Sequence, residues 1–342
     1  MTPEEAKQVE FYAQQIAKIF YADTDPTSIQ TLGGIETVVR QKIQESVSPE
    51  IGGFFIEKVT QTTAGRPRQL KTTLGSLKIT KKQARKLNVK SYTQISEHLE
   101  NCALLISANN SYERAQEDLA MLTGISISHS THQRLVHRQN FDGIISTTPV
   151  KVICIDGGKA RIRTPKGEPC TFNDYKAVVL EGQGINAYFK QNDALTDWVK
   201  KQPMTKPVSC IGDGHDGIWN LFREIAPPSQ RREILDWYHL VENLYKVGGS
   251  LERLHQVKAL LWRGKVEEAI AIFSDCKLET VPNFIAYLTK HRSRLINYQY
   301  FQLEGFTIGS GSVESGVKQI GRRLKISGAQ WDAKNVDQVV KH

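Results

Sequence analysis

The chain has 342 residues, which is long enough for two or three folded domains. Hydrophobic residues make up 39% of it and charged residues 24%, a balance that excludes an intrinsically disordered chain. The formal net charge is +9, and a basic protein of this kind suits a polyanionic partner.

No segment predicts export or membrane insertion. The sequence begins with two acids, Glu4 and Glu5, where a secretory signal would be basic, and no apolar run is long enough to span a bilayer. Five scattered cysteines form no C-x-x-C pair and no zinc spacing, so we expect neither disulfides nor a structural zinc. These features predict a cytoplasmic protein without a membrane partner.

Residues 1–148 predict a mainly helical region that contains a basic segment, 59–90. Apolar residues recur at helical spacing up to about residue 45, and the Pro/Gly stretch 48–53 predicts a break. The basic segment has no acid and nine Lys or Arg residues: Arg66, Arg68, Lys71, Lys78, Lys81, Lys82, Arg85, Lys86 and Lys90. Such a segment is either a solvated surface or an element that contacts phosphates.

Two short patterns lie within the basic segment. Residues 65–68 read Gly-Arg-Pro-Arg, which fits either a plain basic loop or an extended segment in an A·T-rich minor groove. Residues 72–80 alternate like one short strand. The candidates for DNA contact here are Arg66, Arg68, Lys71, Lys81 and Lys82.

Residues 91–139 return to the helical period in three pieces, and the last two, about 111–139, predict a helix-turn-helix. Leu119 and Leu122 are expected to pack the first helix, Gly124 to supply the turn and Ile125 to fill the junction. The second helix would present polar side chains to DNA: Thr131, His132, Arg134, His137 and Arg138. Any helical hairpin can share this pattern, so an ordinary helix pair remains the alternative.

The character changes to α/β in residues 149–342. Three runs separated by turn signals, VKVICIDGG, KARIRT and YKAVVLEGQG, predict antiparallel strands. Helix 192–201, strand 207–212, helix 215–224 and strand 233–236 follow, then an all-α insertion at about 237–304 and a helix at about 312–326. This order of elements resembles that of a ribonuclease H-like fold.

Three acids follow or adjoin these strands and helices: Asp156, Asp213 and Glu314. Carboxylates from separate elements are what a two-metal phosphodiester site requires. Asp156 and Asp213 each have a structural alternative, since Asp156-Gly157 is a hairpin signal and Asp213-Gly214 suits a helix cap. Asp216, three residues after Asp213, is a rival carboxylate. The glycines before Glu314 do not form a dinucleotide loop, because Glu314 replaces the third glycine.

The helix that begins near Glu314 continues as a basic stripe. Lys318, Arg322 and Lys325 follow Glu314 by four, eight and eleven residues, so all of them fall on one helical face. This stripe is either a third candidate DNA contact or an ordinary solvated face.

Four motifs carry a resemblance to a known family. They are Ile155-Asp156-Gly157, GDGHDGIWNLF around Asp213, LDWYHLVENL from Leu235, and IGSGSVESGVKQIGRRLKISGAQW over 308–331. With them the chain resembles the DDE transposases of bacterial insertion sequences, most closely those of the ISKra type, over almost its whole length. The stretch SYERAQEDLAMLTGISIS resembles that family's helical DNA-binding region.

The resemblance implies a DNA transposase that cuts insertion-sequence ends and joins them to target DNA. It implies two Mg²⁺ or Mn²⁺ ions, with Asp156 bridging both, Asp213 holding one and Glu314 the other. Asp236 and His239 are similar to a C/D-x-x-H motif and would order the site or contact DNA. The implied partners are terminal-repeat and target DNA and, to join two ends, a second copy of the chain, in a nucleoid-associated setting.

Two departures and two alternatives accompany the resemblance. The cysteine pairs of many relatives are absent where this chain reads KKQARKLNV, so no zinc-dependent role carries over, and the chain stops at His342, sooner after the last helix than the family leads us to expect. The alternatives are a catalytically inactive, transposase-derived DNA-binding protein and a structure-specific nuclease of the same fold. Loss of one of the three acids would favour the former.

Overall fold

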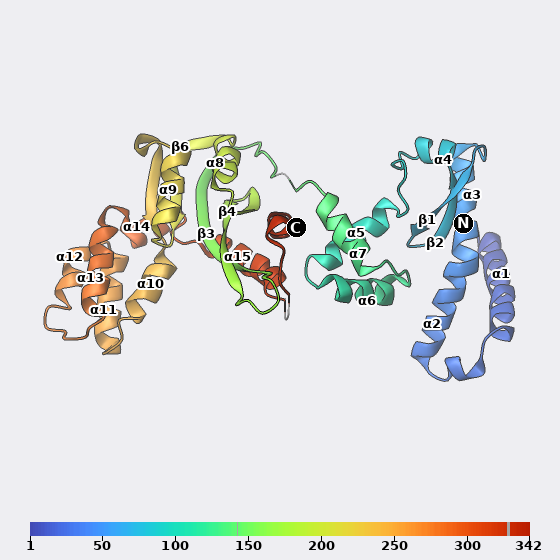
Figure 1. Ribbon diagram of the computed structural model, residues 1–342, viewed down its shortest axis with the longest axis horizontal. Helices are drawn as coiled ribbons and strands as arrows, with labels where there is room; N and C mark the ends of the chain where they lie inside the picture. The colour runs from blue at the N-terminus through green and yellow to red at the C-terminus, as the bar shows by residue number, and fades with distance from the viewer. Residues whose placement is uncertain (142, 327–328) are drawn as a thin grey trace. The chain divides into compact units, whose positions relative to one another are not determined.

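The computed structural model describes residues 1–141, 143–326 and 329–342, and the chain divides into two compact units, Met1–Arg138 and Gln139–His342 (Figure 1). The sequence had placed this division after residue 148. Both units combine helices with strands, so the protein is of the mixed α/β class. None of the helices in the described ranges has the length and apolar character needed to cross a membrane.

The first unit opens with helices that pack only loosely. They are α1 (Pro3–Ala22), a 3-10 turn (Pro26–Ile29), α2 (Leu32–Lys42), a π-helical turn (Ile43–Val47) and α3 (Ser48–Thr60). The break predicted at 48–53 is wrong, because Pro49 lies in the first turn of α3, where its missing N–H removes no helical hydrogen bond. Gly52 lets α3 approach the next sheet, since a Cβ there would lie 2.9 Å from Leu77.

The basic segment folds as a hairpin and a short helix rather than as one strand. Strand β1 (Pro67–Thr72) pairs antiparallel with β2 (Gly75–Thr80), and α4 (Lys81–Lys86) follows. The turn falls inside the run expected to be a strand, and Gly75 takes a φ of 102° there, in a region that favours glycine. Leu70 and Ile79 bury one face of the hairpin, which leaves Lys71 and Lys78 on the other.

Three helices complete the first unit: α5 (Glu97–Ser107), α6 (Tyr112–Thr123) and α7 (His129–Arg138). The predicted helix pair and its turn are confirmed, and Gly124 ends α6 with a φ of 74°. Leu122 is 67% exposed, contrary to expectation, and the buried residues of the junction are Leu119 and Ile127. Leu122 falls outside the stripe of α6 that faces α5 and α7.

The second unit is built on a five-stranded sheet in the order β5-β4-β3-β6-β7. Its strands are β3 (Val150–Ile162), β4 (Thr171–Leu180), β5 (Gly184–Phe189), β6 (Met204–Gly212) and β7 (Arg231–Leu235). Strands β3, β4 and β5 are antiparallel, whereas β6 pairs parallel to β3 and β7 parallel to β6. Two expected strands, VKVICIDGG and KARIRT, are one continuous strand, and β5 was not predicted.

Helices cover both faces of this sheet (Figure 1). Helix α15 (Gly311–Leu324) packs on β3 and β4, where Gly316 lies against Val179 and Ile185. Helix α9 (Asp216–Ile225) packs on the other face, and a Cβ at Gly212 would lie 2.9 Å from Ile218 of that helix. Helices α8 (Asn192–Lys200) and α16 (Ala333–Lys341) both contact β5.

The segment between β7 and α15 contains helices and no strand in the described structure. It consists of α10 (Trp237–Tyr245), α11 (Leu251–Trp262), α12 (Val266–Ala271), α13 (Val281–Lys290), a 3-10 turn (Arg292–Arg294) and α14 (Tyr298–Leu303). Leu254, Val257 and Leu261, which recur at helical spacing in α11, are buried, whereas Leu251 is 64% exposed. These helices share one continuous core with the sheet.

Candidate active site

Asp156 and Asp213 are brought side by side by the parallel pairing of β3 with β6. Cys154 of β3 pairs with Ile211 of β6. Asp156 lies two residues after Cys154, and Asp213 lies two residues after Ile211. Because side chains alternate along extended chains, both acids point to the face that Cys154 presents. That face is covered by α15, since the Cys154 thiol interacts with Ser312.

The surroundings of Asp156 disfavour its ionised form. Asp156 is half-buried in the interior of β3, and its Oδ1 accepts a 2.6 Å hydrogen bond from the N–H of Gly157. Burial raises the pKa of Asp156 above its ordinary value, the bond from Gly157 opposes this rise, and the negative charge of Asp213 adds to it. A pair of neighbouring carboxylates of this kind needs positive charge close by.

Two glycines inside β3 let neighbouring side chains lie across it. A Cβ at Gly158 would meet the Tyr175 ring at 2.4 Å, and one at Gly157 would lie 3.0 Å from Nζ of Lys176. The Asp-Gly-Gly sequence is therefore a site of close packing inside a strand and not the hairpin turn that it indicated. The hydroxyl of buried Tyr175 donates to the carbonyl of Val317 at 3.3 Å and so links β4 to α15.

Asp236 and His239 lie next to this pair of acids. Ile211 pairs with Ile234, so Asp236 follows β7 as Asp213 follows β6. Asp236 is fully buried, caps α10 by accepting the N–H of His239 at 2.8 Å, and also accepts the N–H of Ser310, the residue before α15. Asp236 therefore acts as a helix cap, and the same carboxylate fixes the beginning of α15.

His239 supplies positive charge beside the acids. Its Nδ1 lies 3.3 Å from Oδ1 of Asp236, as an ion pair. The Asp236 carboxylate raises the pKa of His239 to about 9 although burial opposes the rise, and the charges of Asp156 and Asp213 contribute in the same direction. At neutral pH the imidazolium therefore offsets part of the charge of the three aspartates.

Glu314 lies in the first turn of α15, and its carboxylate does not join the aspartates. Its Oε1 forms a 2.6 Å ion pair with Nζ of Lys318 on the same helix, and its side chain is 42% exposed. Within the described ranges, no three Asp, Glu, His or Cys side chains are close enough to form a metal site. Asp156, Asp213, Asp236 and His239 are near enough for their charges to influence one another, but they do not form a preassembled ligand cluster, and Glu314 lies on the helix that covers this face.

The rival carboxylate, Asp216, is the first residue of α9 and pairs with a residue of the helical insertion. Its side chain is 70% exposed and forms a 2.8 Å ion pair with Lys290 of α13. Two further residues of the insertion contact the loop after β6: Tyr287 donates to the carbonyl of Asp213, and a Cβ at Gly214 would lie 3.2 Å from Nε2 of His291. No sequence pattern points to Tyr287, because it lies 74 residues from the acid that it supports.

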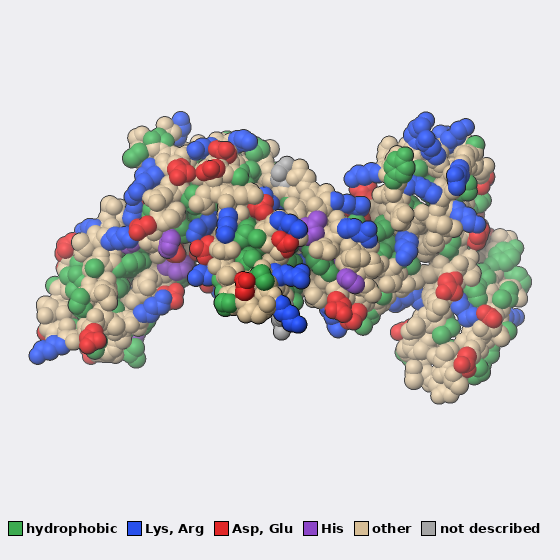
Figure 2. Space-filling model, in the orientation of Figure 1, with side chains coloured by type: hydrophobic (Ala, Val, Ile, Leu, Met, Phe, Trp, Pro, Cys, Tyr) green, Lys and Arg blue, Asp and Glu red, His purple; other side chains and the backbone are tan. Residues whose placement is uncertain are grey.

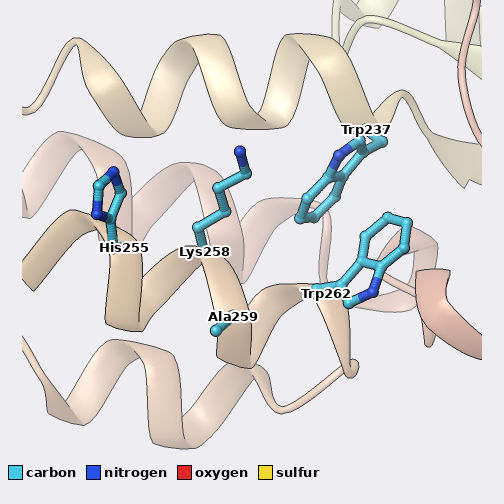
Figure 3. Close-up of a pocket in the computed structure, with 5 residues that line it drawn as sticks. All are labelled: Trp237, His255, Lys258, Ala259 and Trp262. Atoms are coloured by element: carbon cyan, nitrogen blue, oxygen red, sulfur yellow. The ribbon is translucent and has the colours of Figure 1, made fainter.

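A small apolar pocket of about 420 Å³ lies close to Asp236 within the helical insertion (Figure 3). Trp237, the residue after Asp236, and Trp262 form one end of it, with ring centroids 4.7 Å apart. His255, Lys258 and Ala259 of α11 line the rest. The two indole planes are inclined by 59°, so the rings pack against each other and do not form a parallel slot.

The basic residues chosen from the sequence are placed unequally. On α15, Lys318, Arg322 and Lys325 are exposed, although Lys318 is paired with Glu314. On α7, Arg134 is exposed, Arg138 forms an ion pair with Glu100, and His132 is fully buried. His132 is therefore wrong as a DNA contact, because Nδ1 of its ring is hydrogen-bonded to Ser107 inside the helical core.

In the hairpin region, Arg66, Lys81 and Lys82 are exposed, and Lys and Arg side chains gather over the part of the unit that holds α4 (Figure 2). Arg68 and Lys71, in contrast, donate hydrogen bonds to backbone carbonyls of the same unit. These two side chains stabilise the fold as well as adding charge.

The sequence matches no family model, and no curated protein matches it.

Proposed function

We propose that the protein is a DNA transposase whose three metal-binding acids are Asp156, Asp213 and Glu314. The observation that carries the proposal is the register of β3 and β6, which sets Asp156 beside Asp213 on the face covered by the helix of Glu314. The strand order, with three antiparallel strands followed by two parallel ones, supports a ribonuclease H-like fold for this unit.

The residues present suit two divalent cations, Mg²⁺ or Mn²⁺. Carboxylates from β3, from the end of β6 and from α15 supply hard oxygen ligands on three elements. Burial, with the charge of Asp213 adding to it, raises the pKa of Asp156, and a cation would favour its ionised form. Asp156 would hold both ions, Asp213 one and Glu314 the other. When bound, the ions would polarise the attacking and leaving oxygens of a phosphodiester.

The chemistry would consist of two displacements at one site. In the first, water attacks a phosphodiester at the end of the element and releases a 3′-hydroxyl; in the second, that hydroxyl attacks target DNA and displaces a 3′-oxygen there. Glu314 must leave Lys318 and turn toward Asp156 for this purpose. Asp236 positions it, because the bond to the N–H of Ser310 fixes the first turn of α15.

DNA would be held by exposed cations outside the acid cluster. Lys318, Arg322 and Lys325 continue the helix that carries Glu314, so a strand crossing the acids would meet them next. In the first unit, Arg66, Lys81, Lys82 and Arg134 are exposed, as are Lys71 and Arg138, which also bond within the unit. The acid-free basic segment that contains the first three favours binding of specific ends over a nuclease without end recognition.

Joining two ends would require two copies of the chain, and α1 offers a surface for a second copy. This helix has 20 residues and buries none of them. Val9, Tyr12, Ile16 and Ile19 recur at spacings of three and four, as in a coiled-coil seam, and three of them are more than half exposed. We propose a homodimer paired through α1.

The test is cleavage of a labelled duplex carrying the element's own end, with Mg²⁺ or Mn²⁺. Metal-dependent nicking that is abolished in both Asp156→Asn and Glu314→Gln is the expected result. Asp216→Asn is the matched control, because Asp216 follows β6, as Asp213 does, but its carboxylate pairs with Lys290. Specific binding without cleavage by the wild-type protein would instead favour the transposase-derived DNA-binding protein.

A further inference from the structure

A groove of about 730 Å³ lies within the first unit, between the β1–β2 hairpin and the beginning of α7. Two cations, Arg68 and Lys71, are among the described residues that line it, and no acid is. Amide and hydroxyl side chains supply most of the other polar groups: Gln69, Ser76, Gln94, Ser128 and Thr131. The groove is thus positive and rich in groups that both donate and accept hydrogen bonds.

Tyr92 stands at this groove in an unusual conformation. Its side chain is 97% exposed, and its φ is +62°, in the left-handed region that a bulky residue rarely adopts. Such strain persists only where the surroundings impose it. Here Arg68 imposes it, because its guanidinium donates to the carbonyls of both Lys90 and Thr93, on either side of Tyr92.

The walls of the groove are joined to one another. The N–H of Lys71 donates to the carbonyl of Gln94 at 2.8 Å, and the N–H of Ser96 donates to the carbonyl of Lys71 at 2.8 Å. Nζ of Lys71 also donates to the carbonyl of Ser126, in the turn before α7, at 3.1 Å. The hairpin, the Tyr92 loop and the helix-turn-helix therefore form one preorganised surface.

We propose that this groove holds one strand of duplex DNA, with Tyr92 as the aromatic contact. The ring would pack on a deoxyribose, while Gln69 and Gln94 meet base edges and the hydroxyls of Ser128 and Thr131 meet phosphates. Arg68 and Lys71 are positioning residues whose charge also attracts the strand. The inference rests on the proposed function only in taking DNA as the ligand.

The exposed ring and the left-handed backbone of Tyr92 are both unfavourable in the free protein. A tyrosine that is almost wholly exposed gains no burial in the free protein, and its left-handed backbone is unfavourable as well. A ligand that covers the ring would recover the apolar contact. A duplex strand offers such contacts, because the deoxyriboses are accessible along its backbone whatever the sequence.

The experiment measures binding of the full-length chain to a short fluorescein-labelled duplex pool of random sequence, by fluorescence anisotropy. Tyr92→Asn removes the ring and keeps a residue that tolerates the left-handed region, so folding should be unaffected. We expect it to raise the Kd by about tenfold. Tyr92→Phe should bind as the wild type does, and so should Tyr300→Asn, in which an exposed tyrosine of α14 is changed.

A second measurement tests the role of the two amides. When the duplex pool is selected for binding, the Gln69→Ala, Gln94→Ala double variant should lose a base preference that the wild type shows at one or two positions. Unchanged binding by Tyr92→Asn together with an unchanged selected sequence for the double variant would overturn the proposal. A groove that instead binds an acidic peptide would give the same negative result with DNA.

The failure of this inference can be told from the failure of the proposed function. If Asp156→Asn abolishes cleavage while Tyr92→Asn binds normally and the Gln69→Ala, Gln94→Ala double variant keeps the selected sequence, the groove assignment is wrong and the transposase proposal stands. If Tyr92→Asn weakens binding while the wild-type protein never cleaves, the groove stands and the catalytic proposal fails. Absence of any DNA binding by the wild type contradicts both.

Discussion

The hydroxyl of Tyr287 lies 3.4 Å from the backbone carbonyl oxygen of Asp213 and donates a hydrogen bond to it. Tyr287 belongs to α13 of the helical insertion, whereas Asp213 directly follows β6. The insertion thus supports the backbone that carries one of the acids. The ring of Tyr287 also approaches Gly214, whose φ of 101° lets the chain turn immediately after the acid.

This contact predicts a defect in metal binding for Tyr287→Phe. The substitution removes one hydrogen bond, which contributes about 1 kcal/mol to stability, and frees the Asp213 backbone to shift. We expect the Mg²⁺ concentration for half-maximal cleavage to rise several-fold, while the rate at saturating Mg²⁺ changes little. Tyr300→Phe, at an exposed position of α14, should leave the Mg²⁺ titration unchanged. A loss of rate that saturating metal does not restore would contradict a positioning role.

A second prediction concerns Gly158. In Gly158→Ala the new methyl group would lie 2.4 Å from the ring of buried Tyr175, so the ring or the strand must move at a cost of about 1–3 kcal/mol. Displacing Tyr175 also breaks its bond to Val317 of α15, the helix of Glu314. Urea unfolding should show the loss. Gly321→Ala is the control, because open space surrounds that glycine and alanine favours the helix.

These two contacts also show where sequence reasoning ends. Asp213 could be found because it directly follows an apolar strand, and Glu314 because it lies in the first turn of a helix. In both cases the signal is the pattern of the strand or helix that adjoins the acid in the sequence. The supporting residues carry no such signal: Tyr287 and Tyr175 act on elements 74 and 142 residues away along the chain.

The wrong expectations share one physical cause, which is tertiary packing that overrides a local signal. Asp156-Gly157-Gly158 has the composition of a turn, yet it stays extended because Lys176 and Tyr175 need the space that two glycines leave. His132 has the polarity of a DNA contact, yet it completes the helical core through Ser107. The helix pairs and the strands that have strong periodicity were predictable, and the contacts between them were not.

A third prediction follows from the raised pKa of His239. Folding raises this pKa from 6.5 to about 9, so the stabilisation from the charged imidazole is fully present below pH 6.5 and is lost as the pH rises to about 9. The free energy of unfolding should therefore fall between these pH values. His239→Gln should flatten that fall, and Asp236→Asn should lower the pKa of His239 measured by NMR, because the Asp236 carboxylate is its main cause.

The control for this pH series is His255→Gln, which changes an exposed histidine of α11. It should leave the pH dependence of unfolding as in the wild type. A wild-type stability that is flat from pH 6.5 to 9 would contradict the ion pair between His239 and Asp236.

A fourth prediction concerns the cluster of ion pairs that Glu233 forms with Arg231 and Arg294. Glu233 of β7 accepts from Arg231 at 2.7 Å and from Arg294 at 2.6 Å, and its side chain is only 16% exposed. The Arg294 guanidinium also lies 4.1 Å from the centroid of the Trp219 ring in α9. Burial raises the pKa of Glu233, but hydrogen bonds from the two arginines outweigh it and hold this pKa below 4.5.

Glu233→Gln leaves two largely buried guanidinium groups without their carboxylate, so we expect a loss of about 3 kcal/mol in the free energy of unfolding. The wild-type contribution is present above pH 4.5 and is lost as the pH falls through the lower folded-state pKa, so the variant should be less sensitive to acid over that range. Urea unfolding at neutral and acidic pH measures both effects. Glu267→Gln, which breaks the exposed pair with Arg292, should have no measurable effect. Equal losses in the two variants would show that burial does not set the strength of the Glu233 cluster.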